Sequence, residues 1–193
     1  MITRTLMFLA LAVAAPAAHA QSGGELPSRE RAQELLFDAA RLGRTDLVPA
    51  LIAAGADIDA YDPRGFTPLI LAAYNNQLDT VEALLSSKAD PCKPDANQGN
   101  TAQMGVAFKG YDAIAARLLK TTCAVDVRNK QGQTALMMAA MFNRTVQVDM
   151  LLSAGADPSL TDQAGRGAAS VARAQGNDEL APKLEQPRKP HLP

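Results

Sequence analysis

The chain has 193 residues and a formal net charge of -1, from 19 basic and 20 acidic side chains. This length suits one domain or two small ones, and the balanced charge excludes a strongly basic protein that binds nucleic acid. The two histidines, His19 and His191, lie near the ends of the chain, so we expect neither a histidine base nor a histidine metal ligand within the fold.

The first twenty residues have the three parts of a secretory signal peptide in order. Arg4 supplies the positive start, residues 6–15 are an apolar run, and Ala18-His19-Ala20 is a cleavage site of small residues. The run is too short for the roughly 20 residues that span a bilayer. We expect cleavage between Ala20 and Gln21 and export, with the bacterial periplasm as the destination and no membrane association afterwards. A retained membrane anchor or a buried helix is the alternative interpretation.

A flexible lead-in is predicted for residues 21–28, followed by a first helix. Ser28 is a candidate N-cap, and the helix is expected to run through Leu42. The charged side chains at its start are expected to face water: Arg29, Glu30, Arg31 and Glu34.

The remainder of the chain repeats every 33 or 34 residues. Four kinds of marker recur in the same register: a glycine, a threonine two residues later, a pair of small residues and a pair of bulky ones. They are Gly65, Gly99, Gly132 and Gly165; Thr67, Thr101 and Thr134; Ala39-Ala40, Ala72-Ala73, Val106-Ala107 and Ala139-Ala140; Leu51-Ile52, Leu84-Leu85, Leu118-Leu119 and Leu151-Leu152. This regularity predicts a repeat architecture.

Each period is typical of a turn followed by two short helices. Thr67 is a candidate N-cap and Pro68 suits the first helical position, where its missing N–H is no loss. The helix ends at Asn76, a residue type that tolerates the left-handed conformation; Gly43, Gly110 and Asn143 match it in the other units. One helix pair cannot bury its own apolar face, so the units are expected to stack around one continuous core.

These residues resemble the ankyrin-repeat family. The strings that carry the resemblance are Gly65-Phe66-Thr67-Pro68-Leu69, Leu71-Ala72-Ala73, and the loops that begin Gly55-Ala56-Asp57 and Gly155-Ala156-Asp157. The resemblance implies an all-α solenoid of stacked helix–turn–helix units joined by β-turn finger loops. The expected units span 29–65, 66–99, 100–132 and 133–165, with a C-terminal cap over 166–184 and a disordered tail over 185–193. A binding role for the proline-rich, basic tail is the alternative.

The third unit departs most from the family pattern. Thr101-Ala102-Gln103 replaces the Thr-Pro-Leu string, and Thr122-Cys123-Ala124 replaces Gly-Ala-Asp. Cys92 and Cys123 are the two cysteines, and an even count in an exported protein favours a disulfide. Two separate small core residues are the alternative, and a formed bridge could act as a static brace or as a redox switch.

No catalytic arrangement is found, and no cofactor or metal is expected. A serine or cysteine nucleophile has no histidine to activate it, and no glycine-rich phosphate loop is present. The recurring loop aspartates are interpreted as turn-forming and capping residues rather than as metal ligands: Asp57, Asp59, Asp62, Asp90, Asp95, Asp126, Asp157 and Asp162. An enzyme remains the remote alternative.

The resemblance also implies a contact surface, because ankyrin proteins usually hold partners with their finger tips and the adjoining face of the first helices. The matching positions are Tyr61, Pro63, Arg64, Phe66, Tyr74, Asn75, Asn97, Gln98, Asn100, Phe108, Lys109, Arg128, Lys130, Gln131, Gln133, Met141, Phe142, Gln163 and Arg166. Aromatic and arginine side chains are typical anchors. Filling of gaps between units is the alternative role for the aromatic residues. Four methionines are interpreted as core fillers rather than a ligand groove: Met104, Met137, Met138 and Met150.

The sequence thus predicts an exported, non-enzymatic, monomeric repeat protein that binds another protein of unknown identity. The alternative is an accessory factor in periplasmic redox or peroxide-stress defence, for example one that supports a catalase.

Overall fold

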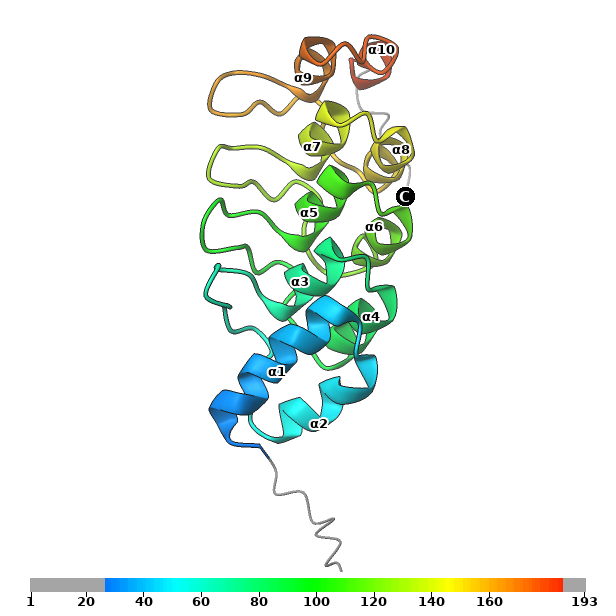
Figure 1. Cartoon of the computed structure of the whole chain (residues 1–193). Helices are drawn as coiled ribbons and strands as arrows, with labels where there is room; N and C mark the ends of the chain where they lie inside the picture. Colours follow the sequence, from blue (N-terminus) through cyan, green and yellow to red (C-terminus); the bar gives the residue numbers. More distant parts are fainter. Residues whose placement is uncertain (1–26, 186–193) are drawn as a thin grey trace, which may run out of the picture.

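The computed structural model describes residues 27–185, which form a stack of five helix pairs (Figure 1). The inner row consists of α1 (Arg29–Leu42), α3 (Pro68–Tyr74), α5 (Ala102–Lys109), α7 (Ala135–Met141) and α9 (Ala168–Ala174). The outer row consists of α2 (Val48–Ala53), α4 (Leu78–Ser86), α6 (Asp112–Leu118), α8 (Thr145–Ser153) and α10 (Ala181–Leu184), with the 3-10 helix η1 (Thr45–Leu47) before α2. Consecutive inner helices pack side by side, and long finger loops project from one edge of the stack.

This architecture confirms the all-α solenoid, and the predicted cap forms a fifth helix pair. The predicted signal peptide over 1–20, its predicted cleavage site, most of the lead-in and nearly all of the tail lie outside the described residues. None of the helices within residues 27–185 has the length and apolar character needed to cross a lipid bilayer.

Four of the inner helices, α1, α3, α5 and α7, begin at hydroxyl N-caps, as predicted for Ser28 and Thr67, whereas α9 follows Gly167 without a side-chain cap. Thr67 Oγ1 accepts the N–H of Ile70, and Thr101 and Thr134 do the same one and two repeats later. Ser28 caps α1 in the same way. Each hydroxyl satisfies one of the backbone donors that the first turn of a helix leaves free.

Each inner helix is followed by a left-handed residue, and at Gly43 and Gly110 this residue lies against a side chain of the next repeat. Asn76 has φ 60° and Gly110 has φ 83°. A Cβ on Gly110 would lie 2.9 Å from the guanidinium of Arg144, whose Nη2 donates to the carbonyl of Phe108 at 3.0 Å. The close approach therefore lets one repeat cap the free carbonyls of the one before.

The core runs the length of the stack, but it divides into two clusters that meet at α5 rather than forming one. Ala102 and Val106 belong to the N-terminal cluster, and Met104 and Ala107 belong to the C-terminal cluster. Alanines of the recurring small pairs are buried, which allows the inner helices to pack closely.

Each finger loop is built around a buried acceptor. Asp62 Oδ1 accepts the N–H groups of Arg64 and Phe66, both at 2.9 Å. Asp95 and Asp162 do the same in their fingers, and the neutral Asn129 takes this place in the third unit. These bonds confirm the turn-forming role predicted for the three aspartates.

Backbone hydrogen bonds then join one finger to the next. The N–H groups of Ala96, Lys130 and Gln163 donate to the carbonyls of Gly65, Gln98 and Gln131 respectively, each at 2.9 Å. The fingers therefore form one connected row, and the side chains that they carry are held at fixed spacings.

The disulfide joins the second and third units. Cys92 and Cys123 are bonded, with their Cα atoms 5.2 Å apart, which confirms the predicted pairing. Cys92 occupies the repeat position of Asp59 and Asp126. At their own junctions these two carboxylates accept the N–H groups of Asp90 and Asp157, at 3.0 and 3.1 Å. The covalent bridge thus stands where the neighbouring junctions use a hydrogen bond.

Candidate functional site

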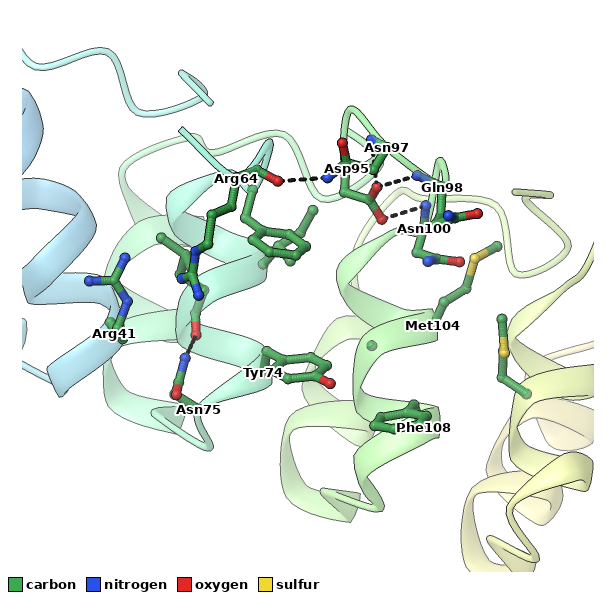
Figure 2. Close-up of a pocket in the computed structure, with 15 residues that line it drawn as sticks. Arg41, Arg64, Tyr74, Asn75, Asp95, Asn97, Gln98, Asn100, Met104 and Phe108 are labelled. Atoms are coloured by element: carbon green, nitrogen blue, oxygen red, sulfur yellow. Dashed lines mark hydrogen bonds between the residues drawn. The ribbon is translucent and has the colours of Figure 1, made fainter. Parts of the chain in front are cut away.

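A groove of about 620 Å³ opens between the inner helices and the finger loops (Figure 2). Its apolar lining comes from Phe66, Ile70 and Leu71 of the second unit, Met104 of α5 and Met138 of α7. This volume is in the usual range for ligand sites, which combine an apolar lining with a few placed polar groups.

Gly105, in the middle of α5, leaves space in the groove lining. In repeat register it corresponds to Leu71 and Met138, which both carry large side chains. Its φ lies outside the left-handed region, and a Cβ added there would make an ordinary 3.5 Å contact with Tyr74. Glycine inside a helix costs about 0.5–1 kcal/mol relative to alanine. Neither backbone conformation nor crowding requires this glycine, so its structural effect is to open the groove.

An aromatic row borders the groove. Tyr74 and Phe108 are stacked, with ring centroids 6.1 Å apart, and Phe108 meets Phe142 edge-on at 4.6 Å. Tyr74 and Phe108 are 41% and 40% exposed, although aromatic side chains favour burial. The ammonium of Lys109 lies 4.9 Å above the Tyr74 ring. Two large rings are therefore presented to solvent on a supported surface.

Two arginines share one buried carboxylate at the N-terminal end of the groove. Asp62 Oδ2 lies 3.4 Å from Arg64 Nε and 3.6 Å from Arg41 Nη2. Arg41 also pairs with Asp38 at 2.8 Å. Arg64 has a 61% exposed side chain, and among the described residues its Nη groups make no hydrogen bond. Arg64 is thus positioned by its Nε and by the Phe66 ring, whose centroid lies 5.5 Å from its guanidinium.

The amide side chains at the finger edge of the groove mostly bind neighbouring fingers. Asn97 Nδ2 donates to the carbonyl of Arg64 at 2.6 Å, and Gln131 Nε2 donates to Gln98 Oε1 at 2.6 Å. Asn129 Nδ2 donates to Asn100 Oδ1 at 2.9 Å. These bonds hold one wall of the groove in place without help from a ligand.

The structure brings part of the predicted contact surface together in this groove. Its lining includes Arg64, Phe66, Tyr74, Asn75, Asn97, Gln98, Asn100 and Phe108. The other predicted contact residues lie outside the lining: Tyr61, Pro63, Lys109, Arg128, Lys130, Gln131, Gln133, Met141, Phe142, Gln163 and Arg166.

Several of these outlying side chains make contacts within the fold. Tyr61 donates its hydroxyl to the carbonyl of Pro94 at 3.0 Å, and Lys130 Nζ donates to two carbonyls of the preceding finger. Gln133 accepts from Asn129. Arg166 donates twice to Asp162, at 2.8 and 2.9 Å. These bonds stabilise the fingers, whatever else the side chains contact.

Sequence reasoning missed part of the lining. Arg41, Leu71 and Gly105 were not proposed for the surface, and Met104 and Met138 were interpreted as core fillers. Met104 is 2% exposed and packs in the C-terminal core cluster, and Met138 is half-buried, yet both also line the groove. The sequence does contain one indication of this groove: a glycine, Gly105, occupies the repeat position at which the neighbouring units have Leu71 and Met138.

The buried carboxylate of the last finger has a perturbed acidity. The backbone N–H of Arg166 is the main cause that lowers the pKa of Asp162 below its ordinary value, and its guanidinium acts in the same direction. This stabilises the charged form that the finger needs.

Among residues 27–185, no group of three or more histidine, cysteine, aspartate or glutamate side chains could hold a metal ion.

Comparison with known proteins gives consistent matches. A family model described as ankyrin repeats (3 copies) matches residues 9–95 and 91–162. The ankyrin repeat protein YahD of Escherichia coli (strain K12) is 33% identical over 147 residues, which cover 71% of each protein. The ankyrin repeat and KH domain-containing protein mask-1 of Caenorhabditis elegans is 33% identical over 151 residues, 78% of this chain but 5% of that protein. An ankyrin repeat-containing protein of Treponema pallidum is 30% identical over 131 residues, 68% of this chain and 44% of that protein.

Proposed function

The chain belongs to the ankyrin-repeat family, and we propose that it acts as a monomeric, non-enzymatic module that binds another protein at the groove and the adjoining fingers. Ankyrin repeats mediate protein–protein interaction, and this supports the binding class.

The observation that carries the proposal is the exposed aromatic pair on a preformed groove. Tyr74 and Phe108 stack on each other at the edge of the apolar lining. Exposed aromatic side chains that rest on a rigid support lose little conformational freedom on binding, which is why such residues dominate binding energy at interfaces.

The test is capture of a partner by variants of this pair. The wild-type chain is crosslinked in a periplasmic extract, and the captured protein is then measured against Tyr74→Ala/Phe108→Ala. We expect the double variant to lose capture while it keeps its helical circular dichroism. Val146→Ala is the matched control, because Val146 is 49% exposed on the outer helix α8. Equal capture by the aromatic variant would refute the proposal.

Export to the periplasm is part of the same proposal. It is supported by the signal-peptide pattern of residues 1–20. The disulfide supports it as well, because disulfides form and persist mainly in oxidising compartments such as the periplasm. Expression of the full chain in a bacterial host, fractionation, and N-terminal sequencing of the product should give a mature chain that begins at Gln21. A cytoplasmic product that retains Met1 would refute export.

A redox or peroxide-stress accessory role is the second candidate, favoured by one observation. Cys92 and Cys123 are only half-buried in surface loops, so a small reductant can approach them. The two roles differ in reduction potential: a value below about -300 mV indicates a structural brace, and a clearly higher value indicates a switch.

A further inference from the structure

We propose that the groove over Gly105 binds an extended acidic segment of the partner protein, with one large apolar side chain of that segment filling the space that the glycine leaves. This inference rests on the proposed function and names the chemistry of the partner at the same surface.

The apolar half of the proposal follows from the repeat register. Leu71 and Met138 project large side chains at the positions before and after Gly105 in the inner row, and Met104 lies beside them. The nearest group that a Cβ on Gly105 would meet is the Tyr74 ring, at 3.5 Å, so this glycine leaves a space beside that ring in the groove lining. Leucine, methionine or phenylalanine from a partner would fill it, and the flanking methionines can adjust to the shape of the incoming group.

The acidic half follows from the charges that the fingers expose. The fingers span residues 61–66, 94–100, 128–133 and 161–166, and within them each exposed charged side chain is basic: Arg64, Arg128, Lys130 and Arg166. The three finger carboxylates are buried and accept N–H groups of their own loops. Asp62 and Asp162 also pair with Arg64 and Arg166, so the fingers carry a net charge of +1 with the basic groups outermost. The whole chain carries a net charge of -1, so the fingers are more basic than the chain as a whole.

The arrangement of these charges fits an extended segment. Arg64 lies at the N-terminal end of the groove (Figure 2). Arg128 and Lys130 belong to the next finger after residues 94–100, and Lys130 Nζ donates to the carbonyls of Ala96 and Asn97 at the edge of the groove. The Nη groups of Arg64 are free of bonds among the described residues, and a guanidinium binds carboxylate in a paired geometry. Acidic residues on both sides of the apolar anchor would therefore meet positive charge.

A peptide fits these features better than a nucleic acid. The basic side chains are few and are spread over several repeats, whereas nucleic-acid sites concentrate many of them. The space at Gly105 is lined by aliphatic and thioether side chains, which suit a branched or flexible apolar side chain of a peptide.

The experiment is selection of random peptides on the immobilised, oxidised chain, followed by fluorescence anisotropy with the enriched peptide. We expect enriched peptides to share one large apolar residue with aspartate or glutamate on both sides. Gly105→Leu should weaken that peptide about 10- to 100-fold, the loss expected when one buried side chain is displaced. Its unfolding midpoint should not fall, because leucine is a better helix former than glycine.

Two further variants serve as controls: one places a leucine away from the groove, and the other removes the positive charge of Arg64. Ala113→Leu introduces a leucine side chain on the exposed side of α6, away from the groove, and should leave binding unchanged. Arg64→Gln changes an exposed side chain and should weaken the peptide several-fold at low salt and less at high salt. It therefore tests the acidic half of the proposal even if Gly105→Leu fails to fold.

The results that overturn the inference are distinct from those that overturn the proposed function. Enrichment of basic or wholly polar peptides, no enrichment, competition by single-stranded DNA, or full peptide binding by Gly105→Leu would each refute the occupant proposed here. If Gly105→Leu still captures the protein partner while Tyr74→Ala/Phe108→Ala does not, the proposed function stands and this inference fails. If both variants capture it, both fail.

Discussion

Removal of the disulfide should cost this stack a large part of its stability. The variant is Cys92→Ser/Cys123→Ser, which replaces a bridge over a sequence separation of 31 residues. On the chain-entropy relation, closing a loop of that length removes about 12 cal/mol/K from the unfolded chain, or about 4 kcal/mol at 25 °C. Each 1 kcal/mol moves the Tm of a domain of this size by about 2–4 °C, so we expect Tm to fall by about 8–16 °C.

The structure supplies a rescue variant for this experiment. At the neighbouring junctions Asp59 and Asp126 accept an N–H from the next repeat. Cys92→Asp/Cys123→Ala puts a carboxylate at the corresponding position, where the N–H of Ala124 is the equivalent donor. A hydrogen bond to a charged group contributes about 1.5–3 kcal/mol, so this variant should recover part of the loss that the double-serine variant shows.

Urea and thermal unfolding followed by circular dichroism measure these differences. Reductant should lower the stability of the wild-type chain to that of the double-serine variant, and it should change neither variant. The absence of a titratable thiol shows that the wild-type chain is oxidised. If the free energy of unfolding of this oxidised chain lies within about 0.5 kcal/mol of that of the double-serine variant, which is the range of ordinary surface substitutions, the reasoning is refuted. A rescue variant no more stable than the serine variant would refute the equivalence of the junctions.

Three further predictions concern two glycines of the α5 region, a helix N-cap and the last finger. Gly105→Ala should raise the free energy of unfolding by about 0.5–1 kcal/mol. Gly110→Ala, at the C-cap of the same helix, should lower the free energy of unfolding by about 1–2 kcal/mol, because residue 110 is left-handed and lies against Arg144. Equal effects of the two variants in urea unfolding would contradict this. Thr101→Ala should cost about 1 kcal/mol through loss of the N-cap, and Thr101→Ser, which keeps the hydroxyl, should cost clearly less in the same assay. The pKa of Asp162 is lowered in the folded chain. Its contribution to stability is therefore present above the pKa of the unfolded chain, near 4, and is lost as pH falls through the lower pKa of the folded chain. In Asp162→Asn, Tm should fall less steeply below about pH 4 than in the wild-type chain, and an unchanged slope would count against this role.

Local rules made the helices and their ends predictable. A threonine followed by proline starts α3, an asparagine ends it in the left-handed conformation, and the finger aspartates cap their own loops. Each of these features depends on residues within a few positions of one another, and the repeat period carries them along the chain.

Repeat register also indicated the contact surface, but it did not predict the groove in that surface. The stacking of Tyr74 on Phe108 could be expected from their matching positions, and the pairing of Cys92 with Cys123 from their number and placement. Met104 and Met138 were assigned to the core alone, because an apolar residue that is buried and an apolar residue that lines a groove have the same sequence pattern.

The sequence by itself determined the repeat, the N-caps at Ser28 and Thr67, and the solenoid, because these depend on short-range contacts that recur along the chain. Only the tertiary structure decided that Arg41 and Arg64 share Asp62, that the core divides at α5, and that the missing side chain of Gly105 opens a groove. Those features depend on how side chains from different repeats are placed across the stack, and that placement is set by packing between helices over distances that no local pattern records.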